Sequence, residues 1–299
     1  MSRRDGTQTL KPRILFNTQP SIVIRAPNVT RNPSPQFAVF CDFDGPIVDV
    51  SDRYYSTYRR VLESLDKPSI QPLTKARFWY LKQHRIPDED IAQQSGVKPH
   101  QMGQFFDLVE ETVNHPDLLH HDCLHPSAKK GLLLLHERGI HLMLVTLRSQ
   151  QQVADLLRDH QLDRLFLRIL GTPEERAAYR NSADYKTDLL ELCWGEYCQA
   201  HGQPNHAWMI GDTEADILAG RRLGISTVAL TCGIRSRAYL DRFQPTFIQD
   251  DVMAAARKLL RVKQQYLTTE STGLAHRANS TPVTDKLTAA RQEIIHSRD

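Results

Sequence analysis

The sequence predicts an α/β protein in which a parallel sheet is interrupted by an all-helical insertion. An apolar run at 37–41 ends in acidic residues, residues 51–125 show helical periodicity without a convincing strand, and helices and strands alternate from about residue 127. Such alternation is typical of a parallel sheet with right-handed crossovers. We therefore expect a core at 36–50 and 126–261, a helical cap at 51–125, a flexible leader at 1–35 and a polar, flexible tail at 262–299.

The first strand is expected at 37–41, where Phe-Ala-Val-Phe-Cys follows a Pro-containing segment and precedes Gly45-Pro46. A continuous apolar run of this kind is typical of a buried parallel strand. Asp42 and Asp44 come directly after it. Acids inside the strand would be costly to bury, whereas at its carboxyl end they face the crevice where open α/β sheets bind ligands. The alternative is a simple turn, because Asp and Gly are favoured turn residues.

Residues 51–125 are expected to form the helical cap. Apolar side chains recur at helical spacing in two stretches: Tyr54, Tyr55, Tyr58, Val61, Leu62 and Leu65, then Phe105, Phe106, Leu108, Val109 and Val113. A helical insertion that follows an acid-bearing strand would close over the ligand crevice and choose the substrate. Arg53, near its start, is a candidate substrate contact; the alternative is an ordinary solvated helix position.

The second half of the core is expected to alternate. Apolar runs, and glycines that end helices, predict helices at 129–138, 151–160 and 215–223 and strands at 140–146, 207–212 and 227–231. The strand at 140–146 ends in Thr146, Leu147 and Arg148. These residues offer a hydroxyl, backbone amides at the next helix start and a guanidinium, all suited to binding phosphate. Thr after a strand is common, and for Arg148 a surface salt bridge is the alternative.

Lys186 lies in the first turn of a helix that is expected to continue through Trp194. A cation there opposes the helix dipole, so its position calls for an anionic partner such as a phosphate or a carboxylate. The alternative is a solvated lysine.

Asp212 lies at the end of the strand at 207–212 and Asp216 comes one helical turn later, so both carboxylates can face one crevice. Mg²⁺ prefers oxygen ligands and retains several waters, which a few carboxylates, a carbonyl and a substrate phosphate would supply. The alternative is that Asp212 is a helix N-cap. Capping explains one acid but not the second.

Composition narrows the function classes. The 299 residues carry a formal charge of only +3, with no block of Lys and Arg interleaved with aromatic residues, which argues against a nucleic-acid partner. The five scattered cysteines are expected to be reduced thiols of a cytoplasmic protein. No apolar segment follows the first residues, so no secretory signal is expected. The apolar stretch 131–145 is interrupted by charged residues and predicts no membrane span.

Four segments, in this order, resemble the motifs of the haloacid dehalogenase-like phosphohydrolase superfamily: Asp42-x-Asp44-Gly45, Val145-Thr146, Lys186, and Gly211-Asp212-x3-Asp216. The resemblance covers roughly residues 36–260 and implies a Rossmann-like parallel sheet. The insertion resembles the C1-type cap of the phosphoglycolate phosphatase and β-phosphoglucomutase branch. Pro46 and Thr187 depart from the residues that are usual in that branch, which leaves the subfamily open.

The resemblance also implies roles for the candidate residues. Asp42 would attack phosphorus, and Asp44 would protonate the leaving alcohol and later activate water. Thr146, Arg148 and backbone amides at Gly45 and Leu147 would bind the phosphoryl oxygens, while Lys186 would offset charge. Mg²⁺ would be held by Asp42, the Asp44 carbonyl, Asp212 and Asp216.

The implied function is a Mg²⁺-dependent phosphatase that hydrolyses a small phosphorylated metabolite through an aspartyl-phosphate. A phosphosugar mutase, a phosphonate hydrolase of the same fold and a non-catalytic binding or regulatory module are the alternatives, because fold and motif do not guarantee activity. Asp44 argues against a carbon-halogen dehalogenase. The sequence identifies no protein partner.

Overall fold

The computed structural model describes residues 37–65, 70–173 and 177–278, with side chains described as far as residue 269. The predicted leader at 1–35 and the part of the predicted tail beyond 278 lie outside the described residues.

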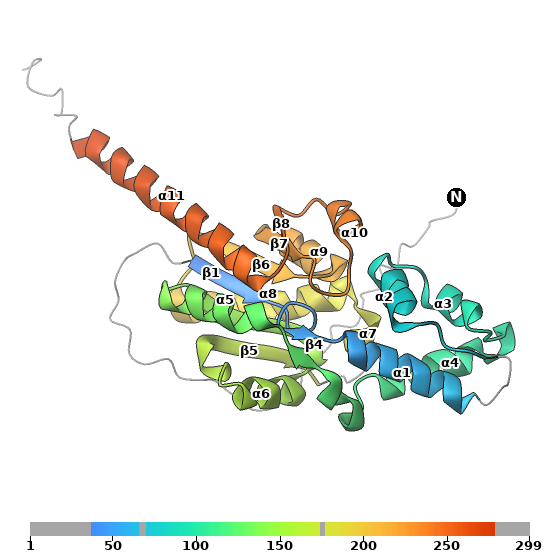
Figure 1. Ribbon diagram of the computed structural model, residues 1–299. Helices are drawn as coiled ribbons and strands as arrows, with labels where there is room; N and C mark the ends of the chain where they lie inside the picture. Colours follow the sequence, from blue (N-terminus) through green and yellow to red (C-terminus); the bar gives the residue numbers. More distant parts are fainter. Residues whose placement is uncertain (1–36, 66–69, 174–176, 279–299) are drawn as a thin grey trace, which may run out of the picture.

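The core is a six-stranded parallel sheet in the order β5-β4-β1-β6-β7-β8 (Figure 1). Its strands are β1 (Phe37–Cys41), β4 (His141–Ser149), β5 (Phe166–Thr172), β6 (His206–Gly211), β7 (Ser226–Leu230) and β8 (Phe247–Gln249). β1 lies between β4 and β6, with Cys41 beside Leu144 and Ile210. Because the strands share one direction, the residues that follow β1, β4 and β6 meet at the same end of the sheet.

Side chains along β1 alternate between two apolar layers. Phe37, Val39 and Cys41 pack in the layer that contains α5, α6 and α11, whereas Ala38 and Phe40 pack against α7, α8 and α9. These helices are α5 (Pro126–Glu137), α6 (Gln150–Asp159), α7 (Ala177–Arg180), α8 (Ala183–His201), α9 (Glu214–Arg222) and α11 (Val252–Ala278). A short helix α10 (Arg237–Asp241) and a 3₁₀ turn η3 (Asp163–Leu165) complete the core. The sheet is therefore covered on both faces, as a parallel sheet requires.

The helical insert, residues 51–125, is connected to the core through two short strands, one at its start and one at its end. It contains α1 (Ser51–Ser64), α2 (Lys75–Gln83), α3 (Asp88–Gln94), η1 (Pro99–Gln101), α4 (Met102–Thr112) and η2 (Pro116–His121). Its last residues are not helical, because β3 (Cys123–Leu124) pairs antiparallel with β2 (Val48–Asp49). The expectation of an insertion without any strand is wrong at this point. Two residues are too few to produce a periodic signal.

Helix α11 corrects the predicted tail. Val252, Ala255, Ala256 and Leu259 are buried against the core, and the helix then continues to Ala278, projecting away from the sheet (Figure 1). The prediction of a flexible tail from 262 is therefore wrong for 262–278. The polar residues there include good helix formers, and extending an existing helix needs no new nucleus.

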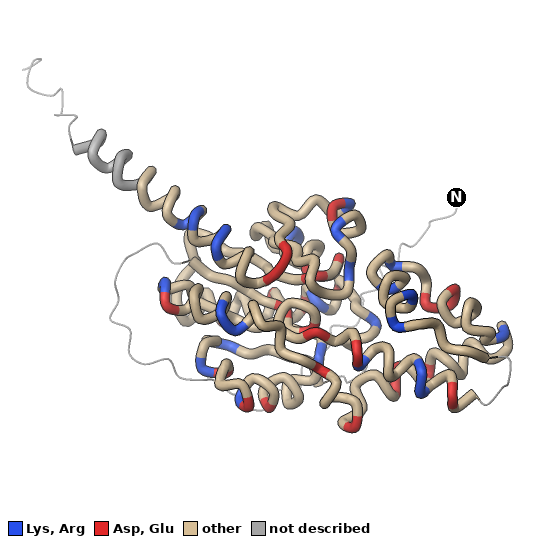
Figure 2. Tube along the Cα trace, in the orientation of Figure 1, with Lys and Arg blue, Asp and Glu red and all other residues tan. Residues whose placement is uncertain are grey.

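Charged residues of both signs are interspersed along the core and the insert (Figure 2). Within the described ranges, no helix combines the length and the apolarity that crossing a bilayer demands.

Candidate active site

The site is assembled from three neighbouring strand ends and two helix starts. Asp42 follows β1, Thr146 lies near the end of β4, and Asp212 follows β6. The pairing of β4 with β5 is interrupted between Val145 and Ser149, so Thr146, Leu147 and Arg148 depart from the regular ladder. Lys186 and Asp216 lie in the first turns of α8 and α9. The structure thus brings together residues separated by up to 174 positions in the sequence.

Lys186 is fixed between two of the acids. Its Nζ lies 2.8 Å from Asp42 Oδ1 and 2.9 Å from Asp216 Oδ1, and the residue is 1% exposed. Burial alone would lower the pKa of Lys186, but Asp216 and Asp42 outweigh it and raise the pKa above the ordinary lysine value. The lysine is therefore a buried cation with two carboxylate partners. The alternative of a solvated helix position is excluded.

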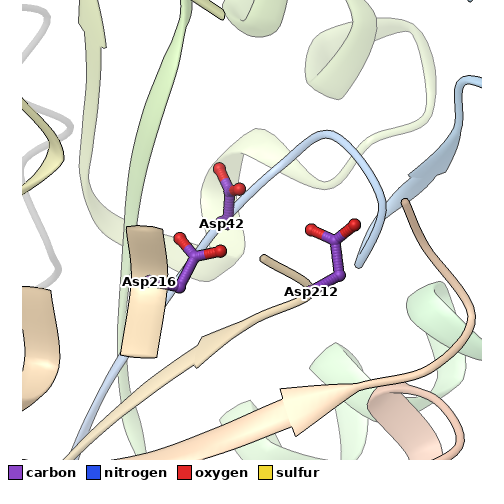
Figure 3. Close-up of side chains that lie close together, drawn as sticks. All are labelled: Asp42, Asp212 and Asp216. Carbon is purple, nitrogen blue, oxygen red and sulfur yellow. The ribbon is translucent and has the colours of Figure 1, made fainter. Parts of the chain in front are cut away.

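Three carboxylates gather at the end of the sheet, and Figure 3 shows Asp42, Asp212 and Asp216 pointing into the same space. Each offers an oxygen within 4.8 Å of the others. Asp212 is fully buried; its Oδ2 accepts a hydrogen bond of 2.5 Å from the Ile234 amide, while its Oδ1 has no hydrogen-bond partner within the described part of the chain. Burial, reinforced by Asp216 and Asp42, raises the pKa of Asp212 well above its usual value.

The donor set fits a divalent cation. Three buried carboxylates beside one lysine leave an excess of negative charge, and hard divalent cations take oxygen ligands of this kind. Burial also raises the pKa of Asp42 to about 7, although Lys186 opposes the shift. A cation bound at the unpaired Asp212 oxygen would satisfy that atom and favour the charged form of each acid.

Glycines allow the acids to pack against the backbone. A Cβ atom on Gly45, whose φ is 95°, would lie 2.1 Å from Asp212 Oδ2, and one on Gly233 would lie equally close. A Cβ on Gly211 would lie 2.1 Å from Asp216 Cγ. Gly45 was expected to offer its amide to a phosphate, but that amide donates to the Val48 carbonyl at 2.9 Å. The structure places Gly45 beside Asp212 instead.

Helix capping at α9 involves a different acid from the one anticipated. Thr213 is the N-cap, and Asp216 accepts from the Thr213 amide at 3.1 Å and from its hydroxyl at 2.9 Å. Asp212 makes no such cap. Asp216 thus combines a capping role with its contact to Lys186.

Asp44 is held by two arginines. Arg148 Nη1 lies 2.9 Å from Asp44 Oδ1, and Arg53 Nη2 lies 2.8 Å from Asp44 Oδ2. Burial would raise the pKa of Asp44, but the Arg148 and Arg53 guanidiniums outweigh it and hold the pKa below its usual value. Both arginine side chains are almost fully buried. The ion pair of Arg148 is therefore buried and not on the surface. Arg53 is not solvated, and its guanidinium is engaged by Asp44.

Sequence reasoning missed the residue that joins these arginines. Asp122, at the end of the insert, lies 2.7 Å from Arg53 Nε and 2.6 Å from Arg148 Nη1, and its side chain is fully buried. It follows two histidines in a segment without periodicity or a recognisable motif. No local signal distinguishes it from an ordinary surface acid.

A cleft between the core and the insert opens onto this site. Its lining includes Asp42, Asp44, Thr146, Leu147, Arg148, Tyr179, Asn181, Thr213 and Arg235 from the core, and Tyr54, Lys82, Arg85 and Asp88 from the insert. Four further residues of the site are buried and do not line the cleft: Arg53, Lys186, Asp212 and Asp216. The cleft therefore presents Asp42 and Asp44 to a ligand, with polar groups from both parts of the chain around them.

The family model described as haloacid dehalogenase-like hydrolase matches residues 39–230. The chain belongs to the haloacid dehalogenase-like hydrolase family. The resemblance inferred from the four motifs is confirmed at this level. The matched region includes all of the strand ends described above except the end of β8.

Among curated relatives of this haloacid dehalogenase-like chain, a phosphoglycolate phosphatase from Vibrio cholerae serotype O1 is 30% identical over 154 residues. The match covers 51% of this chain and 61% of the relative, so it spans less than two thirds of that enzyme. Pyrophosphatase PpaX from Bacillus mycoides is 24% identical over 223 residues, covering 71% of this chain and 91% of the relative.

Solved structures agree on the haloacid dehalogenase-like fold. A haloacid dehalogenase-like family protein from Streptococcus pneumoniae superposes with a TM-score of 0.56 at 22% identity, covering 75% of this chain and 98% of that chain. Protein Tyrosine Kinase A from Mycobacterium tuberculosis superposes with a TM-score of 0.55 at 17% identity, covering 76% and 98%. Similarity at this level of identity shows the fold alone. Because these two proteins carry different names, the fold does not determine the activity, which has to be argued from the site.

Proposed function

We propose that this protein is a Mg²⁺-dependent phosphatase of the cytoplasm that hydrolyses a small phosphomonoester through an aspartyl-phosphate on Asp42. One observation carries the proposal: Asp42 faces the cleft with Lys186 2.8 Å from its carboxylate and two further acids beside it. Covalent catalysis by a carboxylate needs such a group, charged and within reach of phosphorus. The five cysteines, all in the described ranges and all unpaired, fit a reducing compartment.

In the first step Asp42 attacks phosphorus and the ester P–O bond breaks. Asp44, which Arg148 and Arg53 keep ionised before the substrate binds, takes the proton of the phosphomonoester monoanion, whose second pKa is about 6, and gives it to the leaving oxygen. In the second step Asp44 takes a proton from a water that attacks the same phosphorus, and the Asp42–phosphate bond breaks. The Thr146 hydroxyl, the Leu147 amide and Arg148 hold the phosphoryl oxygens.

Asp42, Asp212, Asp216 and the main-chain carbonyl of Asp44 are the residues proposed to hold Mg²⁺. When bound, the cation offsets charge on the transferring phosphoryl group. The unpaired Oδ1 of buried Asp212 supports this assignment, because a carboxylate oxygen without a partner is costly to bury. Lys186 supplies a fixed positive charge between Asp42 and Asp216.

The rest of the cleft favours a leaving group with a second negative charge. Within the described part of the chain, Lys82, Arg85 and Arg235 form ion pairs with two carboxylates: Lys82 Nζ lies 2.8 Å from Asp88, and both arginines contact Glu214. One positive charge is thus in excess. A small phosphorylated acid would use it, and the relatives named phosphoglycolate phosphatase agree with that chemistry.

Pyrophosphate is the second candidate, since its leaving phosphate is also anionic and relatives named pyrophosphatase match most of the folded region. A phosphosugar mutase stays an alternative, because the sugar bisphosphate that it must bind also carries a second anionic group.

The test is a phosphate-release screen with the purified full chain, with and without Mg²⁺, beside Asp42→Asn. Phosphoglycolate, pyrophosphate, p-nitrophenyl phosphate and a neutral alkyl phosphate form the core of the panel. We expect Mg²⁺-dependent release that Asp42→Asn abolishes, with the charged substrates ahead of the neutral alkyl phosphate. Release by the variant equal to that of the wild type, or none by either, would remove the phosphatase proposal. Dependence on a sugar bisphosphate, with total organic phosphate conserved, would indicate a mutase.

A further inference from the structure

A buried ring of charged side chains surrounds Asp44 and crosses between the core and the insert. Asp44 contacts Arg53 and Arg148, and both arginines contact Asp122, which closes the ring. Asp44 and Arg148 come from the core, while Arg53 and Asp122 come from the insert. Two positive and two negative charges balance, which makes the burial of two guanidinium groups tolerable.

Further hydrogen bonds fix the orientation of each guanidinium. Arg53 Nη1 donates to the Val113 carbonyl at 2.9 Å and to Asn114 Oδ1 at 2.5 Å. Arg148 Nε donates to Gln152 Oε1 at 3.3 Å, and the Gln152 amide donates to the Asn114 carbonyl at 3.0 Å. Every nitrogen of Arg53 has a partner. The two arginines are therefore held in one geometry by both halves of the chain.

Asp122 is the member of the ring opposite Asp44, with the two arginines between them. Its side chain is fully buried and does not line the cleft, so it does not touch a substrate. Without its charge, two like cations would converge on the single carboxylate of Asp44, and the Arg53 and Arg148 nitrogens that it engages would lose a partner. A proton donor must lie within hydrogen-bond reach of the leaving oxygen, and small displacements of such groups are expensive in rate.

We infer that Asp122 is a positioning residue, which orients the carboxylate of Asp44 toward the leaving-group oxygen by fixing Arg53 and Arg148. The inference rests on the proposed phosphatase function. It assigns a part in catalysis to a residue that contacts neither the substrate nor the metal ligands.

The test compares two leaving groups in Asp122→Asn. p-Nitrophenolate departs without a proton, whereas a simple alkoxide requires one. A misplaced Asp44 therefore slows phosphoenzyme formation from an alkyl phosphate but not from p-nitrophenyl phosphate. We expect kcat/KM to fall at least about tenfold more for ethyl phosphate than for p-nitrophenyl phosphate, since positioned acid catalysis contributes about 10² to 10⁴. Asp122→Glu, which keeps the charge, should recover part of the loss. Asp117→Asn, an exposed acid on η2, is the matched control and should change neither value.

An equal loss for both substrates in Asp122→Asn would overturn the inference and leave Asp122 a structural residue only. If that variant does not fold, the same comparison in Arg53→Lys decides, because Arg53 contacts Asp44 and Asp122 without lining the cleft, and selective loss for ethyl phosphate is again expected. Failure of the proposed function is distinguishable, because wild-type protein would then hydrolyse neither ester above the level of Asp42→Asn.

Discussion

Lys186 illustrates how a single buried residue organises the site. It neutralises part of the charge of Asp42 and Asp216 at distances of 2.8 and 2.9 Å, and its own raised pKa keeps it protonated. A carboxylate nucleophile surrounded by other acids would otherwise repel an incoming phosphate. On the proposed mechanism, the lysine therefore lets a phosphate approach the carboxylate that is to attack it.

Replacing Lys186 by Met should lower kcat by about 10² to 10³, the loss usual when one preorganised electrostatic partner is removed. The measurement is steady-state hydrolysis of p-nitrophenyl phosphate at saturating Mg²⁺. Lys75→Met, at an exposed position that pairs with Asp52, should behave like the wild type. Near-normal turnover in Lys186→Met would show that the charge of this lysine is not used.

Gly45→Ala should weaken metal binding. The new Cβ would stand 2.1 Å from Asp212 Oδ2 at a φ of 95°, so the carboxylate must move. We expect the Mg²⁺ concentration for half-maximal activity to rise about 10- to 100-fold, the effect usual when the surroundings of a metal ligand are disturbed. Gly195→Ala, where a Cβ meets open space, is the control. An unchanged Mg²⁺ requirement in Gly45→Ala would place the cation away from Asp212.

At the residue scale, the sequence predicts acids at strand ends well and their partners poorly. Asp42, Asp212 and Thr146 could be anticipated because each directly follows or ends an apolar run. Asp122 contacts residues 69 and 26 positions away, and no periodicity records such contacts. Arg53 was misread because a charged residue in an amphipathic helix is normally solvated, whereas here it faces Asp44 from the buried side of α1.

At the scale of elements, the missed strands have clear causes. β5 carries Arg168 in its middle, whose guanidinium lies 2.5 Å from Glu196 of α8, and this charge interrupts the apolar run. β8 has only three residues, which is shorter than the pattern needs. Both are edge strands of the sheet. The three residues of β8 are only partly buried, whereas six of the seven residues of β5 are buried, so for β5 the interrupting charge is the cause. The inner strands were predicted because both of their faces are buried.

The packing of α5 against the start of α11 depends on Gly131. A Cβ there would lie 2.9 Å from backbone atoms of Val252 and Met253, and backbone cannot yield as a flexible side chain can. Gly131→Val should therefore destabilise the fold by about 1–3 kcal/mol through overpacking, measured by urea unfolding. Gly103→Ala in α4, where a Cβ meets nothing, should be neutral or stabilising by up to about 1 kcal/mol. Equal stability of Gly131→Val and the wild type would show that α11 is free to shift.

At the scale of the whole molecule, polar contacts lock the insert onto the core. The Ser236 amide donates to the Gln83 carbonyl at 2.8 Å, and Arg235 Nη1 donates to the Lys82 carbonyl at 3.2 Å. Tyr179 of α7 donates to Asp88 of α3 at 2.6 Å. The order of core, insert and core follows from the sequence of motifs. These contacts could not be predicted, because their partners are separated by 91 to 153 residues.

Asp88 should make stability depend on pH. Burial would raise its pKa, but Lys82, 2.8 Å away, outweighs burial and lowers it. The contribution of Asp88 to the free energy of unfolding is therefore present above the unfolded-state pKa of about 3.9. It is lost as the pH falls through the lower folded-state pKa. Asp88→Asn should be about 3 kcal/mol less stable at pH 7, since Lys82 is left buried without its partner.

Urea unfolding from pH 7 to pH 3 checks this expectation. The difference in unfolding free energy between the wild type and Asp88→Asn should narrow once the pH falls below about 4. Asp90→Asn, an exposed neighbour on the same helix, should follow the wild-type curve throughout. A constant difference across the range would mean that Asp88 titrates normally in the folded protein.

The pairing of β2 with β3 has a consequence for how this architecture can change. The chain departs at Val48–Asp49 and returns at Cys123–Leu124 on the adjacent antiparallel strand, so the ends of the insert are neighbours. An insertion with adjacent ends can be exchanged, lengthened or reduced to a short turn without rethreading the sheet. Asp122 lies just before the returning strand, and Arg53 lies four residues after the departing one. Any transplanted module that omitted these two would keep the proposed nucleophile and the proposed metal ligands but lose half of the ring around Asp44.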